Sequence, residues 1–579
     1  MFSLRRRLKP ENAYIRKCIL FLFLLSFVVC APLYIQGFFE AHDYWAHAMR
    51  LTSTISGLQD GQFPPQVSPT ENSFGMSWNL FYGPLSNYIV ILFRVLTFWI
   101  PGSSTVLAYK LFIFSTFFFS GYFMFRFVLE VSKNENIALL AACLYITAPY
   151  RIVDAFIRLA AGELLVFIFM PMVFHGFYSL FYGNKKKTFY LAVGFAGIAI
   201  SHMISSLFLI IAGIIIVLVN IKKVFKKEYF LPLLTNAAFA LGISAFFLLP
   251  MLQAKGAADY FAFTGGMEKD VAYHASYLYQ ILFGKMDFSS LVWSQPPTTI
   301  KDEVPQVLGL PFVACLMALP FVYGKLQQKQ QRRQMLAFTV SGIVCVILAT
   351  SLIPWGWLQS HFSAIGLIQH SWRFLMLAVF LLSIVSAVVV RLLVPKLEFK
   401  HIFILVLISL LYISPLIAST DNVINRTDIY GDNYMQDYMP QKAYDNMDYV
   451  ENRSHDILVL SGNAELTNQS INGTKTQVTV NAVQESVLEY PYFYYPGYKI
   501  TGSDGTEFEA KESVNGFVSI TVPAGFQGTI QSTFCGTLLT KISLVISIFS
   551  AGCLIALEFL LRRKKAKNKT QTQAVSQSV

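Results

Sequence analysis

The sequence contains few charged residues for its length. Only 13% of its 579 residues are Asp, Glu, Lys or Arg, whereas 55% are hydrophobic. Soluble globular proteins carry about 25% charged residues, so this composition excludes a soluble enzyme and predicts an integral membrane protein. Apolar runs of about 20 residues, bounded by charges or by Pro and Gly, are typical of membrane-spanning helices.

Cysteine and internal repetition are also scarce. The seven cysteines lie in or beside apolar segments, without the paired spacing of a zinc knuckle or a disulfide framework. We therefore interpret them as small apolar residues. The sequence shows no repeat with a short fixed period.

The positive charge is unevenly distributed. The formal net charge is +12, but the basic residues form short blocks between apolar runs, as the positive-inside rule describes. The charge therefore predicts membrane orientation rather than binding to nucleic acid. These blocks are 5–9, 185–187, 222–227, 325–333, 396–400 and 562–569.

With these blocks as cytoplasmic markers, we predict twelve membrane-spanning helices and both termini in the cytoplasm. The first apolar run continues to about residue 37 without a small-residue cleavage site, which indicates an uncleaved span rather than a signal peptide. A further crossing at 82–100 would make the number of spans odd and put the two termini on opposite sides of the membrane, so we predict a helix at the outer interface there. The predicted spans are 17–37, 104–128, 136–150, 163–182, 188–202, 203–221, 230–251, 304–324, 334–354, 372–392, 401–418 and 538–561.

One polar segment between the last two spans has a different pattern. In "TQVTV" and "GFVSITV" polar and apolar residues alternate, and Asp504-Gly505 predicts a turn between two strands. We expect a small extracytoplasmic β-rich domain. The predicted organisation is a transmembrane domain at 1–418, including an external loop at 38–103, the β-rich domain at 419–537, a final helix at 538–561 and a basic cytoplasmic tail at 562–579.

The segment "FFEAHDYWAHAMR" concentrates titratable groups where the first span meets water. Asp43, His47 and Arg50 share one helix face at their spacing. A partly desolvated Asp beside His can accept a proton from an alcohol near neutral pH. Alternatively, Asp43 caps a helix while His42 and His47 lie in the headgroup layer. A zinc site is disfavoured because adjacent residues point apart on a helix.

A second polar cluster occurs in "APYRIVDAFIRLAAGELL". Arg151, Asp154 and Arg158 lie on one helical stripe, with Glu163 just beyond. Charges at membrane depth are costly, so such residues work or pair. The planar guanidinium suits phosphate, but an Asp between two arginines equally suits a structural ion pair.

Two further sites interrupt apolar runs. His202 lies within "AISHMISS", where an isolated His is usually a packing residue. Arg373 lies beside His370 and Trp372 at the outer end of a predicted span. An arginine on that side opposes the positive-inside bias and therefore invites an anionic partner.

Taken together, these segments resemble the GT-C superfamily of membrane glycosyltransferases, in particular the bacterial YfhO-like branch. The segment "HDYWAHAMRLTSTISGLQDGQFPPQVSP" resembles the acidic motif after span one, and "FGMSWNLFYGPLSNYI" resembles a Tyr-x-Pro-Leu juxtamembrane helix. The segments "PYRIVDAFIRLAAGE" and "YPYFYYPGYKI" complete the pattern. The similarity lies in their order and spacing along nearly the whole chain.

The resemblance implies a polyprenyl-phosphate-linked sugar as donor, inversion at the anomeric carbon and an acidic base in the first external loop. By position Asp43 is that base, with His47 as its catalytic companion. Some relatives carry an acidic pair where this chain has one residue, so metal dependence stays open and we predict no metal and no other cofactor. The substrate contacts expected are His42, Arg50, Tyr82, Arg151, Asp154, Arg158, Glu163, His202, Trp372 and Arg373.

We therefore expect an inverting glycosyltransferase in a bacterial plasma membrane, acting on an envelope glycopolymer, a teichoic-acid-type polymer or a glycolipid. A transporter or flippase is the main alternative, because twelve spans are common among secondary transporters. Its expected internal repeat is missing, however, and the charges gather near the outer ends of the spans. A non-catalytic envelope scaffold, with a polymer-binding β-domain, is a third possibility.

Overall fold

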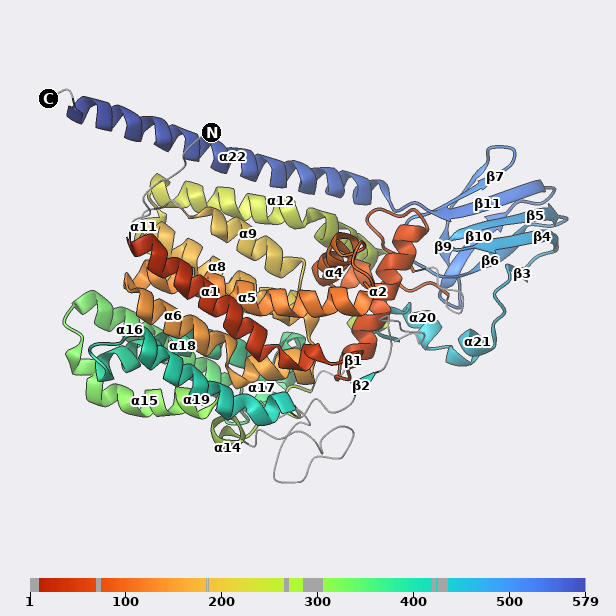
Figure 1. The fold of residues 1–579 in the computed structure, drawn as a ribbon. Helices are drawn as coiled ribbons and strands as arrows, with labels where there is room; N and C mark the ends of the chain where they lie inside the picture. The colour runs from red at the N-terminus through yellow and green to blue at the C-terminus, as the bar shows by residue number, and fades with distance from the viewer. Residues whose placement is uncertain are drawn as a thin grey trace.

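The structure is a computed structural model, and two parts are distinct in it. A helical bundle contains most of the chain, and a β-domain lies beyond one end of the bundle (Figure 1). The residues that the structure describes are 10–68, 74–183, 185, 187–264, 270–284, 306–418, 423–424 and 436–577.

The bundle is organised around helices that are apolar on all sides. The most buried are α8 and α18, which pack with α5 and α6, while α22 lies on the outside against α12 (Figure 1). A helix that is hydrophobic all round is stable only when neighbouring helices or lipid surround it. The helices of at least ten residues are α1 (Pro10–Val29), α2 (Tyr44–Gln59), α4 (Leu85–Leu96), α5 (Thr105–Ser132), α6 (Glu135–Ile146), α8 (Ala161–Phe181), α9 (Phe189–Ala199), α10 (Met203–Val219), α12 (Lys227–Ala257), α15 (Leu310–Val322), α16 (Lys329–Leu348), α18 (Phe374–Leu393), α19 (Phe399–Ala418) and α22 (Leu538–Gln577).

The described residues contain six helices long and apolar enough to cross a membrane, or seven if one bent pair forms a single span. They correspond to seven of the predicted spans. The other five predicted spans are not among them. Helices α9, α10 and α15 are shorter than the roughly 20 residues required, α16 begins with basic and amide residues, and α1 ends at Val29, well before the end of the predicted span 17–37. Helix α4 is also too short to cross.

The bundle has two chemically different ends. The short basic helix α11 (Ile221–Val224) and the turn between α15 and α16 lie at the end away from the β-domain (Figure 1). The start of α1 and the end of α22 lie at the same end (Figure 1). The β-domain and α2 lie at the opposite end (Figure 1).

The bend between α6 and α8 shapes the region near α2. Helix α6 is followed by α7 (Pro149–Ile152) and a π-helical turn (Val153–Ile157), and the axis turns by 50°. Pro149 disfavours helical backbone at the preceding residue, which ends α6. Leu159 then adopts a φ of 57°, a left-handed conformation that costs a non-glycine residue about 1 kcal/mol or more. The backbone is therefore held in place by its surroundings.

The predicted β-rich fold of the segment between α19 and α22 is confirmed. Its two antiparallel sheets have the strand orders β3-β6-β10-β9 and β4-β5-β11-β7-β8 and share one apolar core. The separate pair β1 (Phe38–Phe39) and β2 (Val423–Ile424) connects the first loop to the segment after α19. The strands are β3 (Leu458–Ser461), β4 (Ala464–Asn472), β5 (Lys475–Ala482), β6 (Ser486–Phe493), β7 (Tyr498–Gly502), β8 (Glu507–Phe508), β9 (Lys511–Glu512), β10 (Phe517–Val522) and β11 (Gln527–Phe534).

The β-domain is docked on the first loop. The backbone amide of Phe493 donates to the carbonyl of Phe74 at 2.7 Å, and the Thr474 hydroxyl donates to Asp60. Tyr495, in the "YPYFYYPGYKI" segment, stacks on Tyr260 with ring centroids 5.6 Å apart. The first loop is therefore packed between the bundle and the β-domain.

A buried ion pair stabilises this β-domain. The Arg453 guanidinium lies 3.0 Å from the Glu489 carboxylate, and neither side chain is exposed. Tyr449, Ser513 and Asn515 donate further hydrogen bonds to Glu489. All of the carboxylate's strong acceptor positions are used, which is the condition under which a buried charge is tolerated.

We predict that Glu489→Gln destabilises the domain by about 3 kcal/mol, since it leaves a buried arginine without its counter-ion. The measurement is the thermal unfolding of the purified protein, with proteolytic cleavage of the β-domain as the readout of its unfolding. The control is Glu507→Gln, which removes an exposed pair with Lys499 and is expected to change stability little. Equal shifts in both variants would contradict the prediction.

Candidate active site

Asp43 lies where the first loop contacts the bend after α7. The amides of His42 and Asp43 donate to the carbonyls of Ile157 and Arg158 at 3.0 and 2.9 Å. Asp43 immediately precedes α2, but its side chain caps no amide of that helix. The half-buried carboxylate has no hydrogen bond or ion pair with any residue that the structure describes. The capping alternative is therefore not the arrangement observed.

Glu163, near the start of α8, is the hub of the neighbouring charge cluster. Its carboxylate lies 3.0 Å from Arg373 and 3.4 Å from Arg158, and the Nε2 of His202 is 3.8 Å away. The Tyr150 hydroxyl donates to it at 3.2 Å. Because every side is occupied, Glu163 orients the two guanidinium groups and has little capacity left for a substrate.

The predicted stripe of Arg151, Asp154 and Arg158 is divided in the structure. Arg158 pairs with Asp154 at 2.7 Å and lies 4.3 Å above the ring of Trp372. Arg151 instead lies between the rings of two phenylalanines and donates to Thr116 at 2.8 Å. The π-helical turn alters the helical spacing between these residues, which is why one stripe becomes two sites.

His47 and Arg50 form a second buried group on α2. The Nη1 atom of Arg50 is 2.9 Å from the Nδ1 atom of His47, and its Nη2 donates to the carbonyl of Gly83 at 3.0 Å. The guanidinium also lies 3.6 Å from the centroid of the Tyr82 ring. The Nε2 atom of His47 is 3.3 Å from the amide nitrogen of Ala161, so this group contacts the start of α8, two residues before Glu163.

Gly83 lets these segments approach closely. The Leu85 amide donates to the Ile200 carbonyl at 3.1 Å, and a Cβ atom at Gly83 would lie 2.5 Å from that oxygen. Any other residue would push Tyr82 away from the loop that carries His202. Local steric constraints therefore explain the glycine in the "YGPL" motif.

Sequence reasoning missed a polar network behind α2. The Thr54 hydroxyl donates to the carbonyl of Arg50 at 2.7 Å, and the Asn87 amide donates to the same carbonyl at 3.0 Å. Asn79 donates to Thr54 at 2.9 Å. An asparagine in the apolar helix α4 was the available signal, because buried amides require partners. Tyr150 and Gln369, which contacts Arg373, were also missed.

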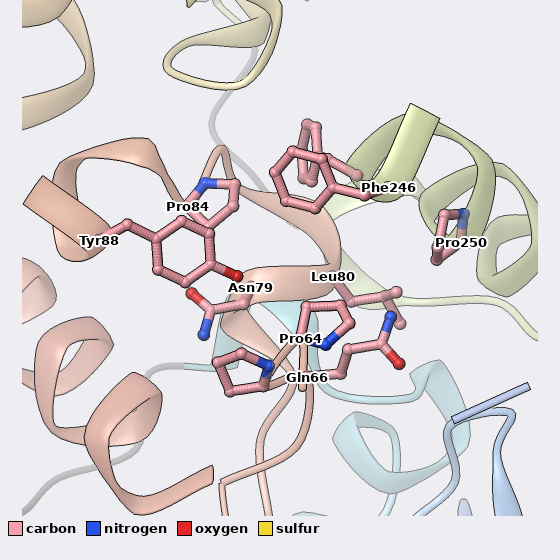
Figure 2. Close-up of a pocket in the computed structure, with 10 residues that line it drawn as sticks. Pro64, Gln66, Asn79, Leu80, Pro84, Tyr88, Phe246 and Pro250 are labelled. Atoms are coloured by element: carbon pink, nitrogen blue, oxygen red, sulfur yellow. The ribbon is translucent and has the colours of Figure 1, made fainter. Parts of the chain in front are cut away.

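A narrow pocket adjoins this network between α4, α12 and the first loop. Asn79 and Gln66 are its polar residues, and Pro84, Tyr88 and Phe246 are among its apolar ones (Figure 2). The pocket brings the start of α4 next to the middle of α12. One of its lining residues, Pro84, follows Gly83, whose carbonyl accepts a hydrogen bond from Arg50.

The surroundings of Asp43 and His47 set their protonation. Burial raises the pKa of Asp43 above its ordinary value, although Arg158 opposes the rise. Burial, together with contact with Arg50, holds the pKa of His47 well below its ordinary value. Asp43 is therefore an accessible carboxylate with increased basicity, and His47 is neutral near neutral pH.

The described residues contain no group of three or more His, Cys, Asp or Glu side chains arranged to hold a metal ion. In particular, His47 faces Arg50 rather than Asp43, so the zinc alternative lacks its third ligand.

One sequence relative and one solved structure are similar to this chain. No protein-family model matches the chain. An uncharacterized protein of Lactococcus lactis subsp. cremoris is 25% identical over 607 residues, covering 94% of this chain and 96% of that protein. The mycobacterial arabinofuranosyltransferase AftD, solved by cryo-EM, is 13% identical with a TM-score of 0.40, covering 77% of this chain. This chain covers only 29% of that enzyme's length.

Glu163 has several ion-pair partners and Asp43 has none among the described residues, so neutralising each carboxylate should affect stability differently. Glu163→Gln leaves two buried arginines without a shared counter-ion and should cost about 3 kcal/mol or more. Asp43→Asn removes an unpaired charge and should change stability by less than about 0.5 kcal/mol. Thermal unfolding in one detergent compares both variants. Equal destabilisation would contradict the assignment of Glu163 as the hub.

Proposed function

We propose that the protein is an inverting glycosyltransferase that moves a sugar from a polyprenyl-phosphate donor to a cell-envelope acceptor. The observation that carries the proposal is a half-buried Asp43 carboxylate without a hydrogen bond or ion pair among the described residues, on backbone that bonds to the carbonyl of Arg158 at 2.9 Å. The charges of Arg158 and Arg373 both lower the pKa of Asp43. A base and fixed cations at one place are the two requirements of this transfer. The sequence resemblance to GT-C enzymes supports the same reaction.

In the proposed reaction Asp43 takes the proton of the acceptor hydroxyl. The hydroxyl oxygen then bonds to the anomeric carbon while the bond from that carbon to the donor phosphate breaks. The configuration inverts in this single displacement, and no covalent enzyme intermediate forms. Arg158 and Arg373 stabilise the negative charge that develops on the departing phosphate.

The other predicted residues support this arrangement. Glu163 and Asp154 hold the two guanidinium groups in position, so we assign them orienting roles rather than substrate contact. His47 and Arg50 fix Tyr82 and the start of α4. Arg151 lies apart, between aromatic rings, and its role in this proposal is structural.

The pocket between α4 and α12 has room for about one water molecule, so the proposed donor site is placed at the arginines and not in this pocket. A flippase would instead require its charged residues along the membrane midplane, whereas Asp43 lies at the start of α2, towards the β-domain (Figure 1).

We predict that Asp43→Asn abolishes transfer while membrane expression stays unchanged, because the amide cannot accept the proton. Transfer from a panel of mass-tagged undecaprenyl-phosphate sugars to bacterial envelope fractions is the measurement. Glu40→Gln is the matched control, since it changes another acidic residue three positions earlier. Activity retained in Asp43→Asn would exclude Asp43 as the base.

The raised pKa of Asp43 predicts a specific pH dependence. Only the deprotonated carboxylate acts as base, so kcat/KM should fall as the pH drops through the pKa of Asp43. The midpoint of this acidic limb should lie above about 3.9, the ordinary value for Asp. Because Arg158 lowers the pKa of Asp43, the residual activity of Arg158→Gln should show a higher midpoint. An acidic limb unaffected by Arg158→Gln would contradict this account.

A further inference from the structure

A hollow of about 200 Å³ lies outside the charge cluster, between residues 270–276 and residues 350–357. Trp355 and Trp357 form its aromatic walls. Ala272, Ala275 and Gly356 form walls without long side chains, and Ser351 contributes a hydroxyl. The volume is comparable to that of one sugar ring and smaller than typical drug-sized ligand pockets.

Hydrogen bonds hold the walls of this hollow in place. The Ser351 amide donates to the carbonyl of Ser276 at 2.9 Å, and the Val271 amide donates to the Gln359 side chain at 3.2 Å. The indole of Trp355 donates to the carbonyl of Thr350 at 3.1 Å. The hollow is therefore a preformed feature of the fold.

The two tryptophans have different exposures. Trp355 is 4% exposed and forms part of the core, whereas Trp357 is 58% exposed and borders the hollow. The ring of Trp357 contacts the ring of His361, with centroids 4.5 Å apart, and its exposed part is available for stacking. None of the lining residues is charged, so the surroundings favour a neutral ligand over a phosphate or an acidic group.

A row of rings connects the hollow with the charge cluster. His274, between the two lining alanines in sequence, has its ring centroid 4.3 Å from that of His370. His370 stacks on Trp372 at 4.8 Å, and Trp372 lies under Arg158 at 4.3 Å. His274 itself does not line the hollow, and three contacts separate its ring from the guanidinium group of Arg158.

We propose that this hollow binds a non-reacting neutral sugar of the acceptor glycan. One face of a sugar ring carries C–H groups that pack on an aromatic ring, and its rim carries hydroxyls that bond to Ser351 and to backbone groups. The acceptor class is then an oligosaccharide or polysaccharide rather than a simple lipid alcohol. This inference rests on the proposed transferase function.

The test measures sugar binding by the full-length protein in nanodiscs of phospholipids without sugar headgroups. The probes are linear tetrasaccharides of glucose, galactose and rhamnose, with no donor present. We expect at least one to bind, and Trp357→Ala to weaken its binding about tenfold or more. Ala272→Leu, which fills the hollow and keeps both tryptophans, should cause a similar loss.

The matched control is Trp99→Ala. Trp99 is also strongly exposed, at 69%, but belongs to the end of the α4 region, so its removal should leave tetrasaccharide binding unchanged. Transfer and binding are measured separately, so loss of transfer in Asp43→Asn tests the proposed function and loss of binding in Trp357→Ala tests this site.

Three results would overturn the proposal. The first is that none of the three tetrasaccharides binds, and the second is that Trp357→Ala and Trp99→Ala bind equally. The third concerns a membrane anchor, since exposed tryptophans also occur at membrane interfaces. The fluorescence of Trp357 is the difference between the wild type and Trp357→Phe. If lipids brominated on their acyl chains quench this fluorescence, and tetrasaccharides do not relieve the quenching, the Trp357 ring lies in lipid.

Discussion

The arrangement of the site depends on one buried carboxylate that holds two arginines from distant parts of the chain. Glu163 lies near the start of α8, Arg158 follows the π-helical turn, and Arg373 precedes α18. Buried guanidinium groups without a counter-ion cost several kcal/mol each, so these three segments are stable only together. The left-handed Leu159 between them is tolerated because this ion cluster and the backbone bonds to His42 and Asp43 fix the surrounding chain.

The first loop extends this constraint to the β-domain. Helix α2 contacts α8 through His47 and supports α3 (Trp78–Phe81) and α4 through the Thr54 network. After α2, the loop bonds to the β-domain through Asp60 and Phe74. A change in the position of the β-domain would therefore be transmitted to α2, and Asp43 stands at the start of that helix. Contacts with the β-domain therefore help to position α2 and Asp43.

Sequence patterns predicted which helices and strands form better than they predicted which residues are in contact. Alternating residues predicted the β-domain, and long apolar runs predicted the helices that are confirmed as candidate spans. The span count failed in part at 188–202 and 203–221, where the structure has the short helices α9 and α10, because an apolar run does not show how many of its residues the helix contains. The stripe from Arg151 to Arg158 failed for a related reason, since a π-helical turn changes the spacing. The pairing of Glu163 with Arg373 joins residues that are 210 positions apart, and no local pattern contains it.

Hydrogen-bond saturation distinguishes the carboxylates of this protein. Glu489 and Glu163 each have several donors, so their lone pairs are occupied and their roles are to hold cations. Asp154 is fully buried and paired with Arg158. Asp43 alone among these four is half-exposed and unpartnered, although the fold brings cations close to it. A base needs free lone pairs and access to its substrate, and these are the two properties that the surrounding structure leaves to Asp43.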